Sequence, residues 1–274
     1  MLVVAFLVVW LIMQLFPVAW LLYSSVKTNS DLYTDIWAPP IPPMQVSLGN
    51  YWVSWTGGYV NIKVGTYLMN SLTVALTSLL ILVFCASLAG YAIARLNMRF
   101  SSTIFYTFLA LISIPAESVV IPLFVMIRSL GLIDNPWGLI LPYVAYNVPF
   151  CVVLARAYFK GFPFELEEAA KIDGCSDFGA FWRIVMPISK GMLAALAIVS
   201  FPGIWNELLF ALVITTRNDT HTLPVGLLLY VGQYATRLDY MFAGLSINVI
   251  ALIIFYVIFN RYIVRGVVAG ALKG

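Results

Sequence analysis

Six stretches of about 20 or more mostly apolar residues divide the sequence, with more polar connections between them. A helix that crosses the hydrocarbon core of a bilayer needs about 20 such residues. The apolar runs are continuous, unlike the alternating strands of a membrane barrel, and a helix satisfies its own backbone groups in lipid. We therefore expect an all-α membrane protein whose six spans form a single domain over residues 1–274. The predicted spans are residues 1–23, 67–92, 104–130, 137–159, 192–214 and 240–264.

The composition agrees with a chain that lies mostly in lipid. Hydrophobic residues make up 62% of the chain and charged residues only 10%, whereas an ordinary soluble domain carries about 25% charged residues. This excludes secreted disulfide scaffolds, disordered regulators and coiled coils. A formal net charge of +3 is too small to indicate a nucleic-acid partner.

The distribution of basic residues predicts the orientation in the membrane. Ten of the fifteen lysines and arginines fall on the side that holds both termini. Because basic loops stay inside, we expect both termini in the cytoplasm. A cleaved signal peptide is the alternative for residues 1–23, but this stretch lacks a basic region and is longer than a usual signal core. Cleavage would leave five spans and an external amino terminus.

Residues that carry common enzyme chemistry are missing from the sequence. The dipeptide Gly-Lys does not occur, so there is no phosphate-binding loop for ATP. The single histidine, His221, is expected at the external surface without a role, and the three cysteines predict neither a disulfide nor a metal site. We therefore expect no catalytic residue, metal or cofactor in this chain.

The most polar stretch is the cytoplasmic connection over residues 161–191. Residues 162–174 predict a short helix that Gly174 ends in a left-handed conformation. Ser176 is placed to cap a second helix, Asp177–Val185, which should stop before Pro187. Ala169 and Ala170 leave a smooth surface that a partner can approach. Composition alone favours a different interpretation, a solvated amphipathic helix at the membrane interface.

The spacing within this loop resembles a known family. Glu168–Ala170, Gly174 and Ile184–Pro187 resemble the cytoplasmic motif of binding-protein-dependent ABC importer permeases, with Met186 in place of leucine. Most of the chain is similar to the maltose-type, carbohydrate-importing branch. Trp205–Leu212 and the tail Arg261–Gly274 resemble its second, six-span permease subunit.

The resemblance implies a type I importer fold in a bacterial or archaeal plasma (inner) membrane. A homologous sister permease, two copies of a cytoplasmic ATPase and an extracytoplasmic sugar-binding protein would complete the assembly, with ATP and Mg in the ATPase. Glu168 would be the polar docking contact, Ala169 and Ala170 the close-packing surface, and Gly174 the turn. Ile184 and Pro187 complete the implied coupling residues.

Two further groups of residues are candidates for binding. The external segment 215–235 resembles the loop that contacts the binding protein, although an ordinary solvated loop would look similar. Polar residues inside spans are candidates for a solute path, and the alternative for each is a bond between helices. The loop candidates are Asn218, Asp219, His221 and Gln233. The path candidates are Glu117, Tyr143, Tyr146, Asn147, Trp205, Asn206 and Glu207.

Three functions follow from these observations. The first is a permease subunit of an ATP-driven sugar importer, with polyols and glycerol phosphodiesters as open alternatives for the solute. The second is a self-contained secondary transporter that couples protons through Glu117 or Glu207. The third is an intramembrane enzyme, which lacks a catalytic constellation. Only the first requires the Glu168–Pro187 segment at fixed spacing.

Overall fold

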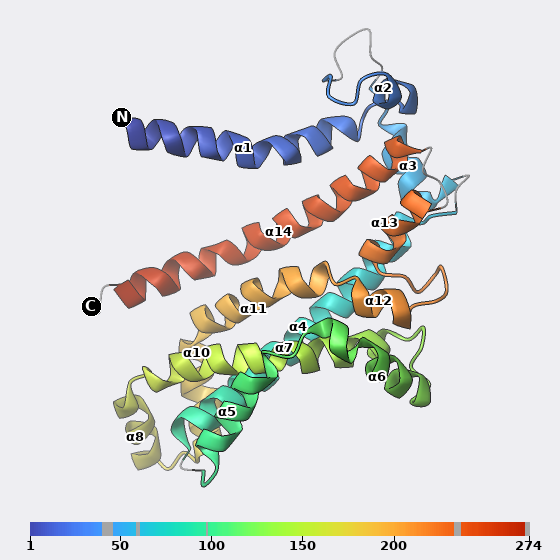
Figure 1. The fold of residues 1–274 in the computed structure, drawn as a ribbon. Coiled ribbons are helices and arrows are strands. Elements are labelled where there is room, and N and C mark those ends of the chain that lie inside the picture. The colour runs from blue at the N-terminus through green and yellow to red at the C-terminus, as the bar shows by residue number, and fades with distance from the viewer. Residues whose placement is uncertain (40–45, 59–60, 97, 233–236, 272–274) are drawn as a thin grey trace. The chain divides into compact units, whose positions relative to one another are not determined.

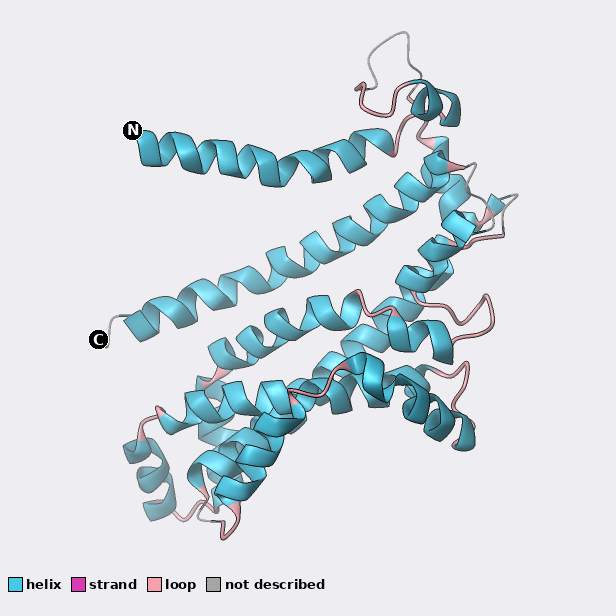
Figure 2. Cartoon of the chain, viewed as in Figure 1, coloured by secondary structure: helices cyan, strands magenta, loops and turns pink. Residues whose placement is uncertain are grey.

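The structure, a computed structural model, describes the chain except residues 40–45, 59–60, 97, 233–236 and 272–274. Over the described part it consists of helices and loops and contains no strand (Figures 1 and 2). The helices are α1 (Leu2–Ser24), α2 (Asn29–Thr34), α3 (Gly49–Thr56), α4 (Val64–Arg95), α5 (Ser101–Leu111), α6 (Ala116–Ser129), α7 (Pro136–Lys160), α8 (Phe164–Ile172), α9 (Asp177–Ala180), a π-helix (Phe181–Val185), α10 (Met186–Ile188), α11 (Lys190–Trp205), α12 (Leu209–Ile214), α13 (Leu223–Gly232) and α14 (Leu238–Ala271).

Four helices in the described part, α1, α4, α7 and α14, are long and apolar enough to cross a membrane. Two bent helix pairs raise the number of candidate spans to six if each pair counts as one. The all-α fold predicted from the apolar runs is therefore confirmed. The bent pairs differ from the straight helices that the hydropathy pattern alone predicts.

The third predicted span, residues 104–130, is broken. Helices α5 and α6 meet at an angle of 101° across a four-residue connection. Pro115 directly precedes α6, and a proline disfavours helical geometry in the residue before it. Pro122 lies inside α6 and does not end it. The break therefore occurs at the first proline alone.

The fifth predicted span, residues 192–214, is also discontinuous. Helix α11 runs through Pro202 to Trp205, and α12 begins at Leu209. Pro202 and Gly203 lie inside α11 and do not end it, and the break follows Trp205. Glu207 lies in this break, and its contacts explain why the chain restarts as a helix there (described below).

Cα positions group the chain into two compact units. One consists of residues 1–72 and 215–253, and the other of residues 73–214 and 254–274. A single functional domain over the whole chain stays a prediction.

The first unit contains an unusual buried cation that organises the segment after α1. Lys27 is fully buried, and its ammonium donates hydrogen bonds to the carbonyls of Asp35 and Ala38. The side chain of Asn50 donates to the carbonyls of Ser25 and Lys27 at 3.0 and 2.8 Å. Buried polar groups need such partners, and these bonds fix α2 and α3 beside the end of α1.

Elsewhere in the first unit, α13 is packed so closely that a tyrosine is shielded from water. The hydroxyl of Tyr230 lies 3.3 Å from that of Ser54. Burial raises the pKa of Tyr230 to about 12, because the phenolate would lose its hydration. The hydroxyl is therefore protonated at physiological pH.

The second unit is built around α7, which packs against α5, α11 and α12. Gly90 lets α4 approach α7, because a Cβ atom there would lie 2.5 Å from the Cβ of Ala155. Phe201 on α11 stacks on Phe255 of α14, and Phe255 stacks on Phe259. This packing positions the cytoplasmic loop and the two broken spans.

Candidate functional site

Helix α8 of the cytoplasmic loop ends as its sequence predicts. Gly174 has a φ of +83°, a conformation that glycine adopts at little cost. The N–H of Cys175 bonds to the carbonyl of Ala170 at 2.9 Å, and the N–H of Asp173 bonds to that of Ala169. These bonds satisfy carbonyls at the helix end in the manner of a Schellman motif.

The second half of the loop is one bent helical segment. The hydroxyl of Ser176 accepts the N–H of Gly179 at 3.1 Å, so the predicted cap of α9 is present. The predicted end before Pro187 is wrong, since the chain stays helical through Ile188. A π-turn over Phe181–Val185 shifts the register directly before Pro187, which lies inside this segment.

The motif residues of the loop do not all face the same way. Glu168 and Ala169 are exposed, whereas Ala170 is only 2% exposed and packs within the chain. The smooth surface open to a partner is therefore smaller than the sequence suggested. Gly174 and Pro187 are exposed, and Ile184 is half-buried.

An acidic residue that the sequence analysis missed lies on the inner face of α8. Glu167 is 4% exposed, and its Oε1 lies 2.9 Å from Nε of Arg95 at the end of α4. The hydroxyl of Tyr91 donates to Oε2 of Glu167 at 3.2 Å. Two signals point to this pair. Arg95 closes a long apolar run, and Glu167 precedes the inward-facing Ala170 by three residues, hence on the same helix face.

Two of the candidate path residues meet inside the second unit. The hydroxyl of Tyr143 donates to Oε2 of Glu207 at 2.7 Å. The carboxylate of Glu207 also accepts the N–H groups of Phe210 at 2.8 Å and Ala211 at 3.1 Å. These are free donors at the start of α12, so Glu207 caps the helix after the break.

Three other path candidates also bond or pack within their own helices. The side-chain amide of Asn147 donates to the carbonyl of Tyr143, and that of Asn206 to the carbonyl of Pro202. Trp205 is 2% exposed and stacks on Phe201 with ring centroids 5.4 Å apart. Of these three side chains only Asn206 is exposed.

Glu117 has a different position from the one expected. It was placed near the middle of a continuous span, but it lies exposed in the first turn of α6. A carboxylate is favourable there, because the amino-terminal end of a helix carries a partial positive charge. Glu117 therefore stands at the start of a helix.

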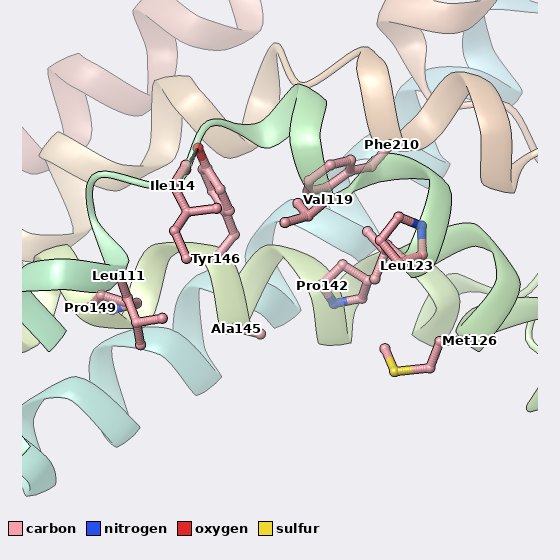
Figure 3. A pocket seen from close by; sticks show the side chains of 11 residues that line it. Leu111, Ile114, Val119, Leu123, Met126, Pro142, Ala145, Tyr146, Pro149 and Phe210 are labelled. Atoms are coloured by element: carbon pink, nitrogen blue, oxygen red, sulfur yellow. Dashed lines mark hydrogen bonds between the residues drawn. The ribbon is translucent and has the colours of Figure 1, made fainter. Parts of the chain in front are cut away.

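An apolar cavity of about 370 Å³ lies where α5 and α6 meet α7 and α12 (Figure 3). Tyr146 is the path candidate that lines it, and its hydroxyl donates to the carbonyl of Ile114 at 3.3 Å. A sugar requires several polar partners, so this cavity by itself does not form a sugar site. Its lining residues are Leu111, Ile114, Val119, Pro122, Leu123, Met126, Pro142, Ala145, Tyr146, Pro149 and Phe210.

The external loop candidates separate into buried and exposed residues. His221 is only 9% exposed, and its Nδ1 lies 3.0 Å from the hydroxyl of Thr215. The expected surface position of His221 is therefore wrong, because its ring is buried. Gln233 lies outside the described residues.

Two of the loop candidates, Asn218 and Asp219, lie at the surface. Asn218 accepts a hydrogen bond from Tyr67 and donates to the carbonyl of Asn61 at 2.9 Å. Asp219 forms an exposed ion pair with Arg217. The backbone of the loop is held to α4, since the amide of Asn70 donates to the carbonyl of Asp219. The loop thus presents Asn218 and Asp219 on a fixed backbone.

No group of three or more histidine, cysteine, aspartate or glutamate side chains in the described residues could hold a metal ion. The candidate site is therefore a set of surfaces and helix breaks. Its most specific geometry is that of the cytoplasmic loop.

The chain is similar to a known protein family and to several of its members. Residues 85–269 match the family described as "Binding-protein-dependent transport system inner membrane component". The chain is 34% identical over 266 residues to the sulfoquinovosyl glycerol transport system permease protein SmoH of Agrobacterium fabrum, covering 96% of this chain and 90% of that protein. It is 33% identical over 262 residues to the trehalose transport system permease protein SugB of Mycobacterium tuberculosis, covering 95% and 93%.

The fold is also similar to a solved structure. A chain of a bacterial ABC transporter involved in the import of the acidic polysaccharide alginate superposes with a TM-score of 0.77. The match covers 95% of each chain at 19% sequence identity. This likeness concerns the fold alone.

Proposed function

The chain belongs to the family of binding-protein-dependent transport system inner membrane components, and from this premise we propose that it is a permease subunit of an ATP-driven sugar importer. The names of two relatives support a sugar-containing solute, since one carries sulfoquinovosyl glycerol and the other trehalose. The solute of this chain is accordingly a monosaccharide, an oligosaccharide or a glycoside.

The geometry of the cytoplasmic loop carries this proposal. Helix α8 exposes Glu168 and Ala169, ends at the left-handed Gly174 and is followed by a capped second helix. A carboxylate beside a small side chain suits docking into a cleft of another protein. ATP and Mg bind to the partner ATPase, and closure of two ATPase copies moves the loop and shifts the spans between states.

The other surfaces take roles that follow from their exposure. We assign the exposed Asn218 and Asp219 to contact with the extracytoplasmic binding protein. Glu117, Tyr146 and Asn206 are exposed in this chain and are the candidates to line a path shared with a homologous sister permease. Tyr143, Trp205 and Glu207 support that path from within, as does Asn147 through its bond to the carbonyl of Tyr143.

The first experiment isolates the chain in detergent at native expression and identifies the co-purifying proteins. We expect a second permease, an ATPase and a sugar-binding protein, and the binding protein can then be screened with mono- and oligosaccharides, polyols and glycerol phosphodiesters. Recovery of the chain alone, still active in proton-driven uptake after reconstitution, would establish a secondary transporter instead.

A matched pair of glycine variants tests whether α8 docks on the ATPase. Gly174→Asp places a side chain in a left-handed conformation, which costs about 1–2 kcal/mol. We expect about 5–30-fold less ATPase retained on the permease at equal expression. Gly161→Asp is the control, because Gly161 also follows a helix end but has an ordinary φ of −91°. Equal ATPase retention by the two variants would contradict docking through this turn.

A further inference from the structure

Four segments of the second unit meet at one buried junction on the cytoplasmic side of α4. Tyr91 and Arg95 come from the last turns of α4, and Glu167 comes from α8. The ring of Tyr91 packs against Phe159 of α7 at 5.6 Å and against Phe181 of the π-helix at 4.8 Å, between ring centroids. The end of α4 is therefore in contact with both halves of the cytoplasmic loop.

We infer that Tyr91, Arg95 and Glu167 form a clamp that makes α8 and the end of α4 move as one rigid body. This inference rests on the proposed function. When the ATPase moves α8, α4 would therefore move with it. The same movement would also be transmitted along the chain to α11. The three are positioning residues, because they act through the docking surface and contact neither solute nor nucleotide.

The first support is the chemistry of the ion pair. The side chains of Arg95 and Glu167 are 12% and 5% exposed. Water screens such a pair weakly, and removing one partner leaves a charge buried without compensation. A pair of this kind resists separation far more strongly than the exposed pair Arg217–Asp219, whose side chains are 64% and 62% exposed.

The second support is the number of segments that each group joins. The guanidinium of Arg95 bonds to Glu167 on α8 and also donates to the carbonyl of Phe162, just after α7. The carboxylate of Glu167 accepts from both Arg95 and Tyr91, so both of its oxygens are bonded to α4. Sliding α8 along α4 would break both bonds to Glu167 together, which favours joint movement.

The third support is the division of faces on α8. Glu168, the proposed docking contact, is exposed, while its neighbour Glu167 points into the junction. In contrast, the second half of the loop meets α11 at a bend of 73°. A bent connection changes its angle more easily than a buried, multiply bonded contact. The clamp is therefore the stiffer of the two routes into the membrane.

The test measures the distance between α8 and α4 in the complete transporter with its sister permease and ATPase in lipid nanodiscs. Spin labels are attached at Ala94→Cys on α4 and Ile172→Cys on α8, where Ile172 is 86% exposed. Cys85, Cys151 and Cys175 are replaced by serine. We expect the same distance by pulsed electron resonance without nucleotide and with the ATPase trapped by ADP and vanadate.

Three variants connect this distance to energy coupling. Glu167→Gln removes the charge, and Tyr91→Phe removes one hydroxyl while keeping the ring packing. We expect both to broaden the distance distribution on trapping and to lower the stimulation of ATP hydrolysis by the loaded binding protein at least about fivefold. Glu165→Gln is the matched control on the same helix, because Glu165 is exposed, and it should leave both readouts unchanged.

Each outcome has a definite meaning. A native distance that changes on trapping would show that α8 moves relative to α4 and would overturn the clamp. Native stimulation in both Glu167→Gln and Tyr91→Phe would overturn it as well. If the pair were merely structural, the two variants would lower the yield of assembled transporter. Their distance distribution and their stimulation per assembled complex would then equal those of the native protein. Failure of the ATPase to co-purify would overturn the proposed function together with this inference.

Discussion

Glu117 and Glu207 are the two carboxylates that lie inside predicted membrane spans, and both stand where a broken span resumes as a helix. Glu117 lies in the first turn of α6, and Glu207 accepts two N–H groups at the start of α12. An acidic residue is favourable at both places, because free N–H groups and the helix dipole attract negative charge. Their positions thus have a local electrostatic reason, independent of proton coupling.

The two carboxylates differ in the strength of this effect, which makes a testable comparison. Glu207→Ala should destabilise the purified transporter by about 1–2 kcal/mol, because it removes a capping side chain and the partner of Tyr143. Glu117→Ala should cost only about 0.3–1 kcal/mol, since it removes a charge near a dipole but no capping bond. Thermal unfolding in detergent measures both.

A third variant separates capping from charge. Glu207→Gln keeps a carbonyl oxygen that can accept the N–H of Phe210, so it should fall between Glu207→Ala and the native protein. A different result would be a Glu207→Gln variant with the native unfolding temperature but with slower transport and a changed pH profile. In that case Glu207 titrates during transport, and a capping role alone does not explain it.

At the scale of helices, the closeness of α4 and α7 depends on one missing side chain. A Cβ atom at Gly90 would lie 2.5 Å from the Cβ of Ala155 and 2.9 Å from the backbone nitrogen of Arg156. Real Cβ atoms do not come so near other atoms, and a packed helix pair has little room to yield. Gly90 therefore sets the distance at which α4 meets α7, directly before Tyr91 of the buried junction on the same helix.

Two identical substitutions test this packing. Gly90→Ala should destabilise the assembled transporter by about 1–3 kcal/mol, because the helices must separate. Gly203→Ala on α11 meets no atom within 4 Å, and it should stabilise by about 0.4–1 kcal/mol because alanine restricts the unfolded chain. The unfolding midpoints of the two variants should move in opposite directions. A shift of both in the same direction would contradict the tight contact.

At the scale of the whole molecule, the distribution of lysine and arginine among the loops predicts the orientation in the membrane. The five lysines and arginines expected outside are Lys27, Lys63, Arg128, Arg217 and Arg237, and the other ten fall on the opposite side. A surplus of basic residues holds a loop in the cytoplasm. These counts predict that the cytoplasmic loop lies on the ATPase side and the loop around Asn218 on the binding-protein side.

Labelling with a membrane-impermeant maleimide tests this orientation. With Cys85 and Cys151 replaced by serine, Cys175 should react only in inside-out vesicles. A second variant, Arg217→Cys with all native cysteines replaced, should react in right-side-out spheroplasts, because this side chain is 64% exposed. The opposite pattern would invert the topology and remove the loop from the ATPase side.

Features that depend on neighbouring residues were determined by the sequence alone. The apolar runs located α1, α4, α7 and α14 to within a few residues, except at the end of α14. Ser176 and Gly174 could be identified as a cap and a left-handed turn, because each acts on backbone within a few positions. The spacing of the cytoplasmic motif likewise identified the family.

Features that depend on pairing between distant residues were decided only by the tertiary structure. Arg95 and Glu167 are 72 positions apart, and Tyr143 and Glu207 are 64 apart. Hydropathy shows that a helix is apolar, but the rotation that turns Glu167 inward comes from how the helices pack. The burial of His221 has the same origin. The sequence thus determined the four long apolar helices and the family to which the chain belongs. Packing decided which polar groups meet, because contact between helices depends on their mutual rotation and distance.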